Sequence, residues 1–380
     1  MPIDLKDRIE NSALAFRGYN ITNYGRSAEL LQHPVYGSHV AEALAEASHV
    51  CGEVLKRPAD LARDVQANRP ATLETFAEDI ALIVAMEVAH IRLLEMYHDV
   101  DIQQADMAYG YSLGEATALV CGGVYTLSDI LRPLITMAPD CAELGRDVTM
   151  GIVFSRGLEL NVPAVYKLCL EINRQGQGVI GVSAELSPNT ALVLGQGTTV
   201  ERFAQRMPDV FPSHVHLRRN DRHWPPLHTP ILWERDITCR AARLWHTVDH
   251  QPATPHPRVF SLATGAFSYK DYNSRDVLYR WLDHPQLLWE AVFATLTAGV
   301  GTIIHVGPEP NLIPATFRRI AENVEQQLQG GSPRSMGLRA VAAIWRPWIG
   351  KWLSSKSALL RAPYIEHVIL EDWLLENAPT

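Results

Sequence analysis

Several common classes of protein are disfavoured by what this 380-residue sequence lacks. No stretch approaches the roughly 18 consecutive apolar residues that a membrane-spanning helix needs. The first residues, MPIDLKDRIENS, have mixed charge and no apolar segment of the kind found in signal peptides. The net charge of −8 gives no nucleic-acid signature. We therefore expect no export signal, no membrane span and no nucleic-acid partner.

Cysteine is scarce, and its arrangement matters as much as its number. The five cysteines are odd in number, widely spaced and free of any C-x-x-C pair, which disfavours both a disulfide framework and a zinc site. The 15 histidines include no H-E-x-x-H motif. We expect a cytoplasmic protein with reduced cysteines, no metal and no bound cofactor.

What the sequence does contain is a serine between two glycines, in YGYSLGEATALV at residues 109–120. Ser112 stands in the pattern G-x-S-x-G, between a short strand-like run and a run rich in helix-forming residues. A strand, a sharp turn and a helix are the context in which this motif presents a nucleophile, and Gly110 and Gly114 would let helix and strand approach. The start of the helix adds free N–H groups close to where an oxyanion would form. Ser112 is therefore a candidate nucleophile.

The order of predicted elements indicates an α/β fold. Residues 79–97 are apolar nearly all round, as expected for a helix beside a central strand, and a second helix is predicted over 126–137. From 148 to about 217 the strand-like and helix-like runs follow the order βαββαβ, which is typical of a ferredoxin-like unit. Strands that alternate with helices on either side of this unit indicate a mainly parallel sheet.

These runs predict three parts. Residues 1–147 and 226–330 form a large α/β-hydrolase-like lobe, residues 148–225 form an inserted ferredoxin-like lobe, and residues 331–380 form a C-terminal helical extension.

A serine nucleophile needs a base, usually histidine, within hydrogen-bond distance. The chain order of α/β hydrolases favours a histidine near the C-terminus, which points to His305. His228 lies instead in a proline-rich loop, HWPPLHTPIL, where the chain returns from the small lobe to the large one. Clefts form at such junctions, so both histidines are candidates.

Four segments together resemble a known family. GYSLGEATALV, the inserted lobe, PPLHTPIL and WLDHPQLLWEAVFATLTAGVGTIIHVGP are similar, in order and spacing, to malonyl-CoA:acyl carrier protein transacylases and to the acyltransferase domains of polyketide synthases. The resemblance extends over residues 16–320. It implies an acyltransferase of fatty acid or polyketide biosynthesis. Such an enzyme moves an acyl group from a CoA or carrier-protein thioester, through an ester on Ser112, to the phosphopantetheine thiol of an acyl carrier protein.

The resemblance also implies roles for individual residues. His228 would be the general base, oriented by the backbone carbonyl of Trp281. The backbone N–H groups of Leu113 and Tyr19 would form the oxyanion hole. The family usually has F-x-G-Q-G where this chain has FRGYN at residues 16–20. A backbone donor tolerates that change of side chain, but the mouth of the pocket would differ.

The predicted acyl pocket departs from the family at the position that recognises malonate. The arginine that clamps the free carboxylate of a malonyl group corresponds here to Met137. Leu227 precedes the histidine, Asp79 aligns with a glutamine of the family, and Tyr111 adjoins the serine. Burying a malonyl carboxylate without a cation would cost several kcal/mol. We therefore expect an acyl group without that carboxylate.

The sequence leaves the fate of the acyl-enzyme open. A carrier thiol would complete a transfer, whereas water would make the protein a hydrolase that clears acyl groups from carrier proteins. Arg218, Arg219 and Arg222 lie near the His228 loop and are candidates for contact with an acidic carrier protein.

The C-terminal segment raises a separate hypothesis. Trp345, Trp348 and Trp352 are interleaved with Arg339, Arg346, Lys351 and Lys356, a mixture found in interfacial helices. The segment would dock on a membrane or a partner enzyme, or else pack on the catalytic lobe.

Overall fold

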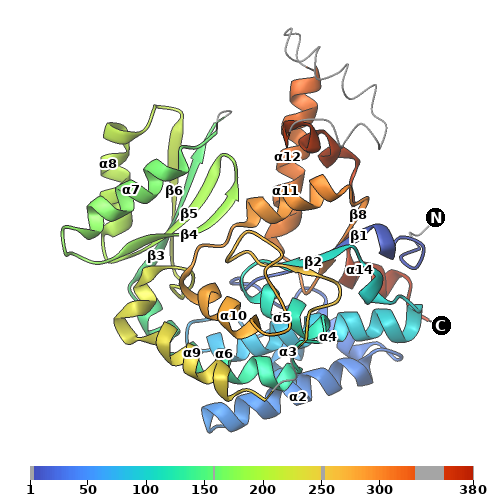
Figure 1. Cartoon of the computed structure of the whole chain (residues 1–380). Coiled ribbons are helices and arrows are strands. Elements are labelled where there is room, and N and C mark those ends of the chain that lie inside the picture. The colour runs from blue at the N-terminus through green and yellow to red at the C-terminus, as the bar shows by residue number, and fades with distance from the viewer. Residues whose placement is uncertain (1–3, 157–158, 250–252, 330–354, 380) are drawn as a thin grey trace.

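The computed structural model describes residues 4–156, 159–249, 253–329 and 355–379. These residues form two lobes, each built on its own β-sheet (Figure 1). Within the described residues the larger sheet has five parallel strands in the order β7-β2-β1-β8-β9. The strands are β1 (Ser12–Phe16), β2 (Met107–Gly110), β7 (Val259–Phe260), β8 (Thr302–Val306) and β9 (Glu366–Ile369).

Helices cover both faces of the larger sheet, with α2, α4 and α6 on one side and α11 and α12 on the other (Figure 1). The helices of this lobe are α1 (Ser27–Gln32), α2 (Gly37–Leu55), α3 (Leu61–Gln66), α4 (Phe76–His98), α5 (Leu113–Cys121), α6 (Leu127–Gly145), α9 (Ile237–Thr247), α10 (Ser274–Asp283), α11 (Leu288–Ala298), α12 (Leu312–Gln329) and α14 (Leu370–Glu376). Short 3-10 helices are η1 (Ile9–Asn11), η2 (Ile102–Gln104), η3 (Pro230–Arg235) and η5 (Ser355–Tyr364).

Strand β1 shows why the sheet has a core on each face. Successive side chains of a strand point to opposite faces. Leu14 and Phe16 enter the core shared with α2 and α4, whereas Ala13 and Ala15 enter the core shared with α11 and α12. All five residues of β1 are buried, as expected for a parallel strand covered on both sides.

The smaller sheet is antiparallel, in the order β4-β5-β3-β6. Its elements follow one another as β3 (Val148–Ser155), α7 (Val162–Asn173), β4 (Ile180–Ser187), β5 (Thr190–Gln196), α8 (Thr199–Val210) and β6 (Val215–His223). This is the βαββαβ order that the sequence predicts. The predicted fold class, a large lobe with a mainly parallel sheet and a small ferredoxin-like lobe, is confirmed.

Helix α6 is longer than the sequence predicts. The prediction ends at Met137, but the helix continues to Gly145 with both Pro133 and Pro139 inside it. Thr126 caps its start by accepting a hydrogen bond from the backbone N–H of Asp129. Each proline removes one backbone donor, yet packing of the apolar face against α2, α4 and α9 maintains the helix.

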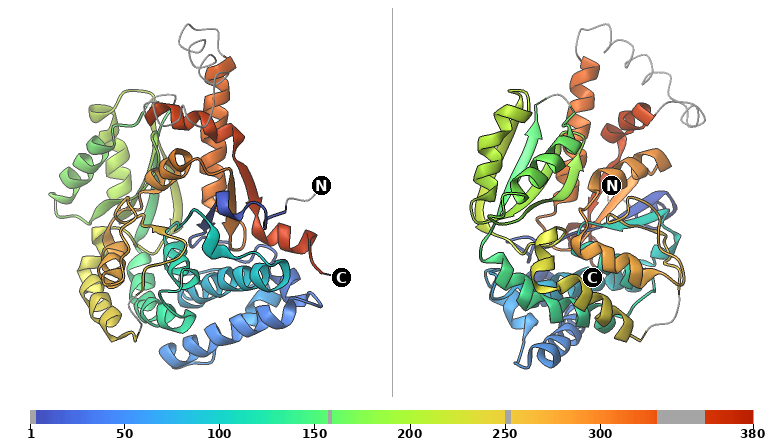
Figure 2. Two further views of the ribbon diagram at one scale, coloured as in Figure 1. Left: turned by 45° about the vertical axis from the view of Figure 1, so that its right-hand side comes forward. Right: turned by 60° about the vertical axis from the view of Figure 1, so that its left-hand side comes forward.

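The C-terminal segment differs from the predicted helical extension. Strand β9 pairs in parallel with β8 and extends the larger sheet, and α14 then packs beside α4. The red C-terminal segment accordingly lies against the large lobe in both views of Figure 2. Residues 366–376 therefore belong to the large lobe. The sequence analysis missed this because a four-residue strand carries little pattern.

The tryptophans of the C-terminal hypothesis, Trp345, Trp348 and Trp352, lie outside the described residues, so docking by this segment stays a prediction. Within the described part of the chain, no helix combines the length and the apolarity that crossing a bilayer requires.

The packing of α14 predicts that the end of the chain contributes to stability. Leu374 is fully buried, so Leu374→Ala should lower the free energy of unfolding by about 2–5 kcal/mol. The adjacent Leu375 is only partly buried, and Leu375→Ala should cost about 1 kcal/mol. Urea unfolding of both variants measures the difference. Small and equal effects would show that this segment does not pack in the core.

Candidate active site

Ser112 lies on a sharp turn between β2 and α5. Its backbone has φ 52° and ψ −116°, a strained conformation for a residue with a side chain. A Cβ atom on Gly110 would lie 1.9 Å from the backbone carbon of Gly114, and one on Gly114 would lie 2.4 Å from the backbone oxygen of Phe16. No larger residue fits at either glycine, so the motif builds the turn that presents the serine.

His228 is the histidine that the fold brings to Ser112. The serine Oγ lies 2.6 Å from His228 Nε2. On the other side of the ring, Nδ1 lies 2.7 Å from the backbone oxygen of Trp281. A carbonyl only accepts hydrogen bonds, so Nδ1 carries the proton and Nε2 is free to accept the proton of the serine. His305, the other candidate, contacts a different residue. Its Nε2 lies 2.9 Å from the Nδ1 of His367.

Burial keeps the imidazole of His228 neutral. The side chain is almost fully covered, and this desolvation lowers its pKa to about 4, although the Trp281 carbonyl acts in the opposite direction. At neutral pH the ring is therefore in the form that can take a proton from Ser112.

Leu113 and Tyr19, whose backbone N–H groups are predicted to form an oxyanion hole, line the same cavity as Ser112. Leu113 is the first residue of α5, and Tyr19 follows Gly18, whose added Cβ would lie 2.7 Å from the backbone oxygen of Tyr111. Within the described part of the chain, the backbone N–H groups of Leu113 and Tyr19 make no hydrogen bond. Both donors remain available to a developing negative charge.

Arg17 holds the loop that carries Tyr19, and no sequence pattern singles it out. This arginine is fully buried, and its Nε donates to the backbone oxygen of Gly18 at 2.8 Å. Its Nη2 donates to Asn23 Oδ1 at 2.9 Å, and its Nη1 donates to the backbone oxygen of Pro308. These hydrogen bonds of the guanidinium fix the position of the loop.

Gln286 is a second site residue that the sequence analysis missed. Its Oε1 accepts the backbone N–H of Ser112 at 3.0 Å, and its Nε2 lies 3.2 Å from His228 Nδ1. Its backbone pairs with β4 of the small lobe: the N–H donates to Ser183 and the carbonyl accepts from Glu185, each at 2.9 Å. One buried residue thus joins the small lobe to the serine.

An apolar chamber opens beside Ser112. It is walled by α4, α6 and α9 and by residues next to His228, and no charged side chain is among the described residues that line it. Met137 and Leu227, two of the four residues predicted for an acyl pocket, lie in its wall. The lining residues are Tyr19, Phe76, Ile80, Ser112, Leu113, Pro133, Leu134, Met137, Ala138, Cys141, Leu227, Ala241, Trp245, Trp281 and Leu282.

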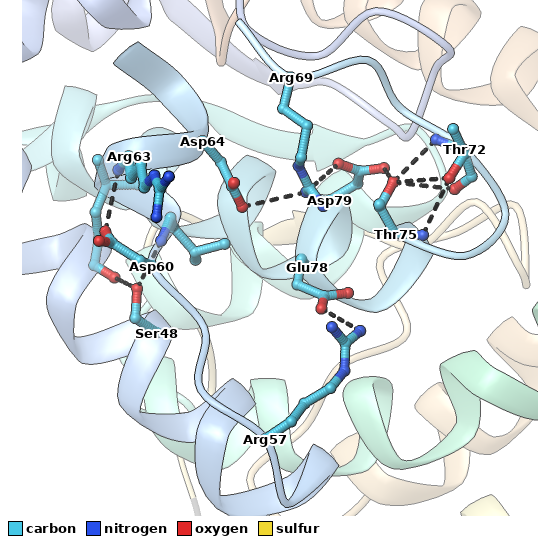
Figure 3. A network of polar contacts seen from close by, with 12 residues as sticks. Ser48, Arg57, Asp60, Arg63, Asp64, Arg69, Thr72, Thr75, Glu78 and Asp79 are labelled. Atoms are coloured by element: carbon cyan, nitrogen blue, oxygen red, sulfur yellow. Dashed lines mark hydrogen bonds and ion pairs between the residues drawn. The ribbon is translucent and has the colours of Figure 1, made fainter. Parts of the chain in front are cut away.

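Asp79 does not line this chamber. It is fully buried and accepts hydrogen bonds from Arg69 Nη2 at 3.2 Å and from Thr75 Oγ1 at 2.9 Å (Figure 3). Burial raises its pKa to about 7, although both partners act against that shift. Its neighbours Phe76 and Ile80 on α4 face the chamber instead, so Asp79 belongs to a polar network behind the wall and not to the predicted acyl pocket.

A second, larger cavity, the interlobe cleft, has a volume of about 710 Å³. Tyr111 lines this cleft and not the apolar chamber. Tyr19, Phe76, Ser112 and Leu227 line both cavities and form the neck between them.

The three candidate arginines on β6 do not form one patch. Alternation along the strand places Arg218 at the interlobe cleft and Arg219 on the opposite face, where it pairs with Glu201 and, at 2.7 Å, with Asp221. Arg222 is exposed near the end of the strand. A basic contact for a partner would therefore depend on Arg218 and Arg222.

Neither models of known protein families nor curated protein sequences match this chain. Solved structures define the class of the fold, which is that of the malonyl-CoA:acyl carrier protein transacylases. The resemblance predicted from the sequence is confirmed at the level of the fold.

Three solved structures illustrate the likeness. The malonyl-CoA:acyl carrier protein transacylase of Xanthomonas oryzae pv. oryzae is 21% identical, with a TM-score of 0.68 over 83% of this chain and 93% of that one. FabD of Acinetobacter baumannii is 17% identical, with a TM-score of 0.67 over 89% and 100%. A malonyl-transacylase in complex with a type II polyketide synthase acyl-carrier protein is 20% identical, with a TM-score of 0.64 over 81% and 92%.

The lowered pKa of His228 predicts an unusual pH profile for the reactivity of Ser112. A base with the ordinary histidine pKa of about 6.5 would be mostly protonated at pH 5.5, and the rate would fall about tenfold from pH 8. With a pKa of about 4 the ring stays neutral, and the rate should change less than about twofold. The measurement is the rate of labelling by a fluorophosphonate between pH 5 and 8, with Ser112→Ala as the unlabelled control. A midpoint near 6.5 would contradict the effect of burial.

The contacts of Gln286 predict that it positions Ser112. Gln286→Met keeps the volume of the side chain but removes the acceptor for the serine N–H, so labelling should slow by about 10- to 100-fold. Gln286→Glu keeps an acceptor and places a carboxylate beside His228, which raises the pKa of the imidazole. This variant should retain labelling at pH 8. As the pH is lowered, its labelling should fall off at a higher pH than that of wild type. Wild-type rates in Gln286→Met would remove the positioning role.

Proposed function

We propose that the protein is a serine acyltransferase that moves an uncarboxylated acyl group from a CoA or carrier-protein thioester to the phosphopantetheine thiol of an acyl carrier protein. The observation that carries the proposal is the 2.6 Å contact between Ser112 Oγ and His228 Nε2 at the neck of an apolar chamber. The transacylase-like fold supports it, since the solved neighbours are named as malonyl transferases of acyl carrier proteins.

The proposed reaction has two symmetrical halves. His228 takes the proton of Ser112 as the serine oxygen attacks the thioester carbonyl, and the backbone N–H groups of Leu113 and Tyr19 receive the oxyanion. The protonated imidazole then gives its proton to the departing thiolate. In the second half His228 deprotonates the incoming carrier thiol, which attacks the ester and restores the serine.

The wall of the chamber supports a donor without a second carboxylate. A malonyl group on Ser112 would place its negative charge among apolar side chains that include Met137, and a buried unpaired carboxylate costs several kcal/mol. A hydrocarbon chain meets no such cost and gains from leaving water.

The interlobe cleft supports a long thiol arm as the route of entry. Residues of both lobes line it, and Ser112 and His228 are among them. Arg156, Arg218 and Arg319 are among its lining residues and offer positive charge to a phosphate or to an acidic carrier protein. The cytoplasm remains the proposed location, supported by five unpaired cysteines.

Intact-protein mass spectrometry tests the proposal. Wild type and Ser112→Ala are incubated with malonyl-, acetyl-, butyryl- and longer acyl-CoA thioesters, and a phosphopantetheinylated carrier protein is then added. We expect an adduct on wild type alone, formed from uncarboxylated donors at least about tenfold faster than from malonyl-CoA, and its passage to the carrier. Loss of the adduct to water with no passage would make the protein a hydrolase.

Met137→Arg tests the substrate argument within the same assay. An arginine at this position would supply the missing cation, so malonyl loading should rise relative to butyryl loading. Met137→Leu keeps an apolar wall and should leave the ratio unchanged. If wild type prefers malonyl-CoA, another cation reaches the chamber and the proposed donor class is wrong.

A further inference from the structure

The peptide group between Gly18 and Tyr19 lies against the side chain of Ser112. A Cβ atom added to Gly18 would lie 3.3 Å from the Cβ of Ser112 and 2.7 Å from the backbone oxygen of Tyr111. The N–H of this peptide group belongs to Tyr19, and within the described residues it makes no hydrogen bond. The direction of this N–H therefore decides whether it can serve an oxyanion formed at Ser112.

The carbonyl of the same peptide group is held by the guanidinium of Arg17. Its Nε donates to the backbone oxygen of Gly18 at 2.8 Å. The bond between Gly18 and Tyr19 is not one of the cis peptide bonds of the described chain. In a planar trans peptide the C=O and the N–H point in opposite directions. The hydrogen bond that fixes the Gly18 carbonyl therefore also fixes the direction of the Tyr19 N–H, which points away from Arg17.

Further hydrogen bonds hold the guanidinium itself. Its Nη2 donates to Asn23 Oδ1 at 2.9 Å, and its Nη1 donates to the backbone oxygen of Pro308. Asn23 Oδ1 also accepts the backbone N–H of Asn20 at 3.0 Å. Arg17 thus fixes the peptide group before Tyr19 directly, and the one after it through Asn23.

The charge of Arg17 adds an electrostatic effect. The side chain is fully buried. Burial lowers its pKa to about 10, although the nearby carboxyl groups of Glu87, Glu309 and Glu371 act in the opposite direction. The guanidinium is therefore charged at neutral pH. A cation that donates to a carbonyl oxygen polarises the whole peptide group, and this effect is larger in the protein interior than in water. The Tyr19 N–H thereby becomes a stronger donor.

We infer that Arg17 is a positioning residue for the reaction of Ser112, because its guanidinium orients and polarises the peptide group whose Tyr19 N–H would receive the oxyanion. The inference rests on the proposed function, since it takes that N–H as an oxyanion donor. A contact elsewhere in the loop would stabilise the fold without fixing the direction of this N–H. The bond to the Gly18 carbonyl is what separates the positioning role from a purely structural one.

Saturation kinetics of labelling by a fluorophosphonate are the first test. The reagent needs neither an acyl donor nor a carrier protein, and its phosphoryl oxygen gains negative charge as Ser112 attacks. Arg17→Met keeps an apolar stem but removes every donor of the guanidinium. We expect its maximal labelling rate to fall about 10- to 100-fold, while the reagent concentration that gives half of this rate changes less than about twofold.

Arg17→Lys is the conservative variant. Lysine keeps the positive charge but has a methylene group in place of Nε, so the donor that faces Gly18 is lost. The maximal rate should lie between those of Arg17→Met and wild type. Should Arg17→Met fail to fold, a wild-type rate in Arg17→Lys would overturn the inference.

Leu44→Ala is the control for a general loss of stability. Leu44 is fully buried on α2 and is not among the described residues that line either cavity. Its truncation should destabilise the fold without turning the Tyr19 peptide group, and labelling should keep the wild-type rate. Urea unfolding places both variants on one scale of stability. Equal slowing in Arg17→Met and Leu44→Ala would reduce Arg17 to a structural role.

The amide resonance of Tyr19 gives a direct readout. In protein that contains ¹⁵N-tyrosine, its cross-peak is assigned by its absence from Tyr19→Phe. Modification of wild type by the fluorophosphonate should move the amide proton downfield, because the N–H then donates to the phosphoryl oxygen. In Arg17→Met this movement should be less than about half as large. Equal movement in the two proteins would overturn the inference, and no movement in wild type would overturn the predicted oxyanion hole with it.

Acyl loading separates this inference from the proposed function. If wild type takes up the fluorophosphonate but no acyl group from any thioester, the proposed acyltransferase is contradicted, while slow labelling of Arg17→Met still supports the positioning role. If wild type loads acyl groups and Arg17→Met labels at the wild-type rate, only the inference about Arg17 is overturned.

Discussion

The site depends on one buried tryptophan that fastens both members of the serine–histidine pair. The backbone oxygen of Trp281 accepts the Nδ1–H of His228 at 2.7 Å, and its indole N–H donates to the backbone oxygen of Ser112 at 2.8 Å. Both bonds are buried, and a hydrogen bond is electrostatically stronger in the protein interior than in water. The strained backbone of Ser112 and the tautomer of His228 are therefore fixed by the same residue, and no acidic side chain is needed to orient the imidazole.

A few buried contacts also hold the two lobes in a fixed arrangement around Ser112 and His228. His228 follows directly after the small lobe, whereas Ser112 and Trp281 belong to the large one. Gln286 spans the junction, with its backbone paired to β4 and its side chain on Ser112. A rotation of one lobe against the other would strain these bonds, so the reactivity of Ser112 would depend on the relative position of the lobes.

The sequence predicted the parts of the site that local geometry encodes. Glycine spacing specifies the turn at Ser112, and the resemblance supplied His228 and the Trp281 carbonyl. Asp79 was misplaced because α4 is apolar on nearly every side, so no pattern marks which face meets the substrate, and one residue of misalignment rotates a side chain by about 100°. Gln286 and Arg17 could not be found, since each acts through contacts with segments far away in the chain. Strand β9 is too short to leave a periodic signal.

In the proposed reaction the two cavities would have different tasks: the apolar chamber would hold the acyl chain, and the interlobe cleft would admit the attacking group. This division bears on whether the protein transfers or hydrolyses the acyl group. A chain bound in the apolar chamber fills the space on one side of the ester, so the attacking group must arrive from the interlobe cleft. His228 lines that cleft and could take a proton from either a thiol or a water molecule. Selection of the nucleophile thus depends on which group the cleft positions beside the imidazole, and selection of the acyl chain depends on the wall of α6 and α9. Residues of the chamber would then set donor preference with little effect on the partition between thiol and water, because a different cavity makes each choice.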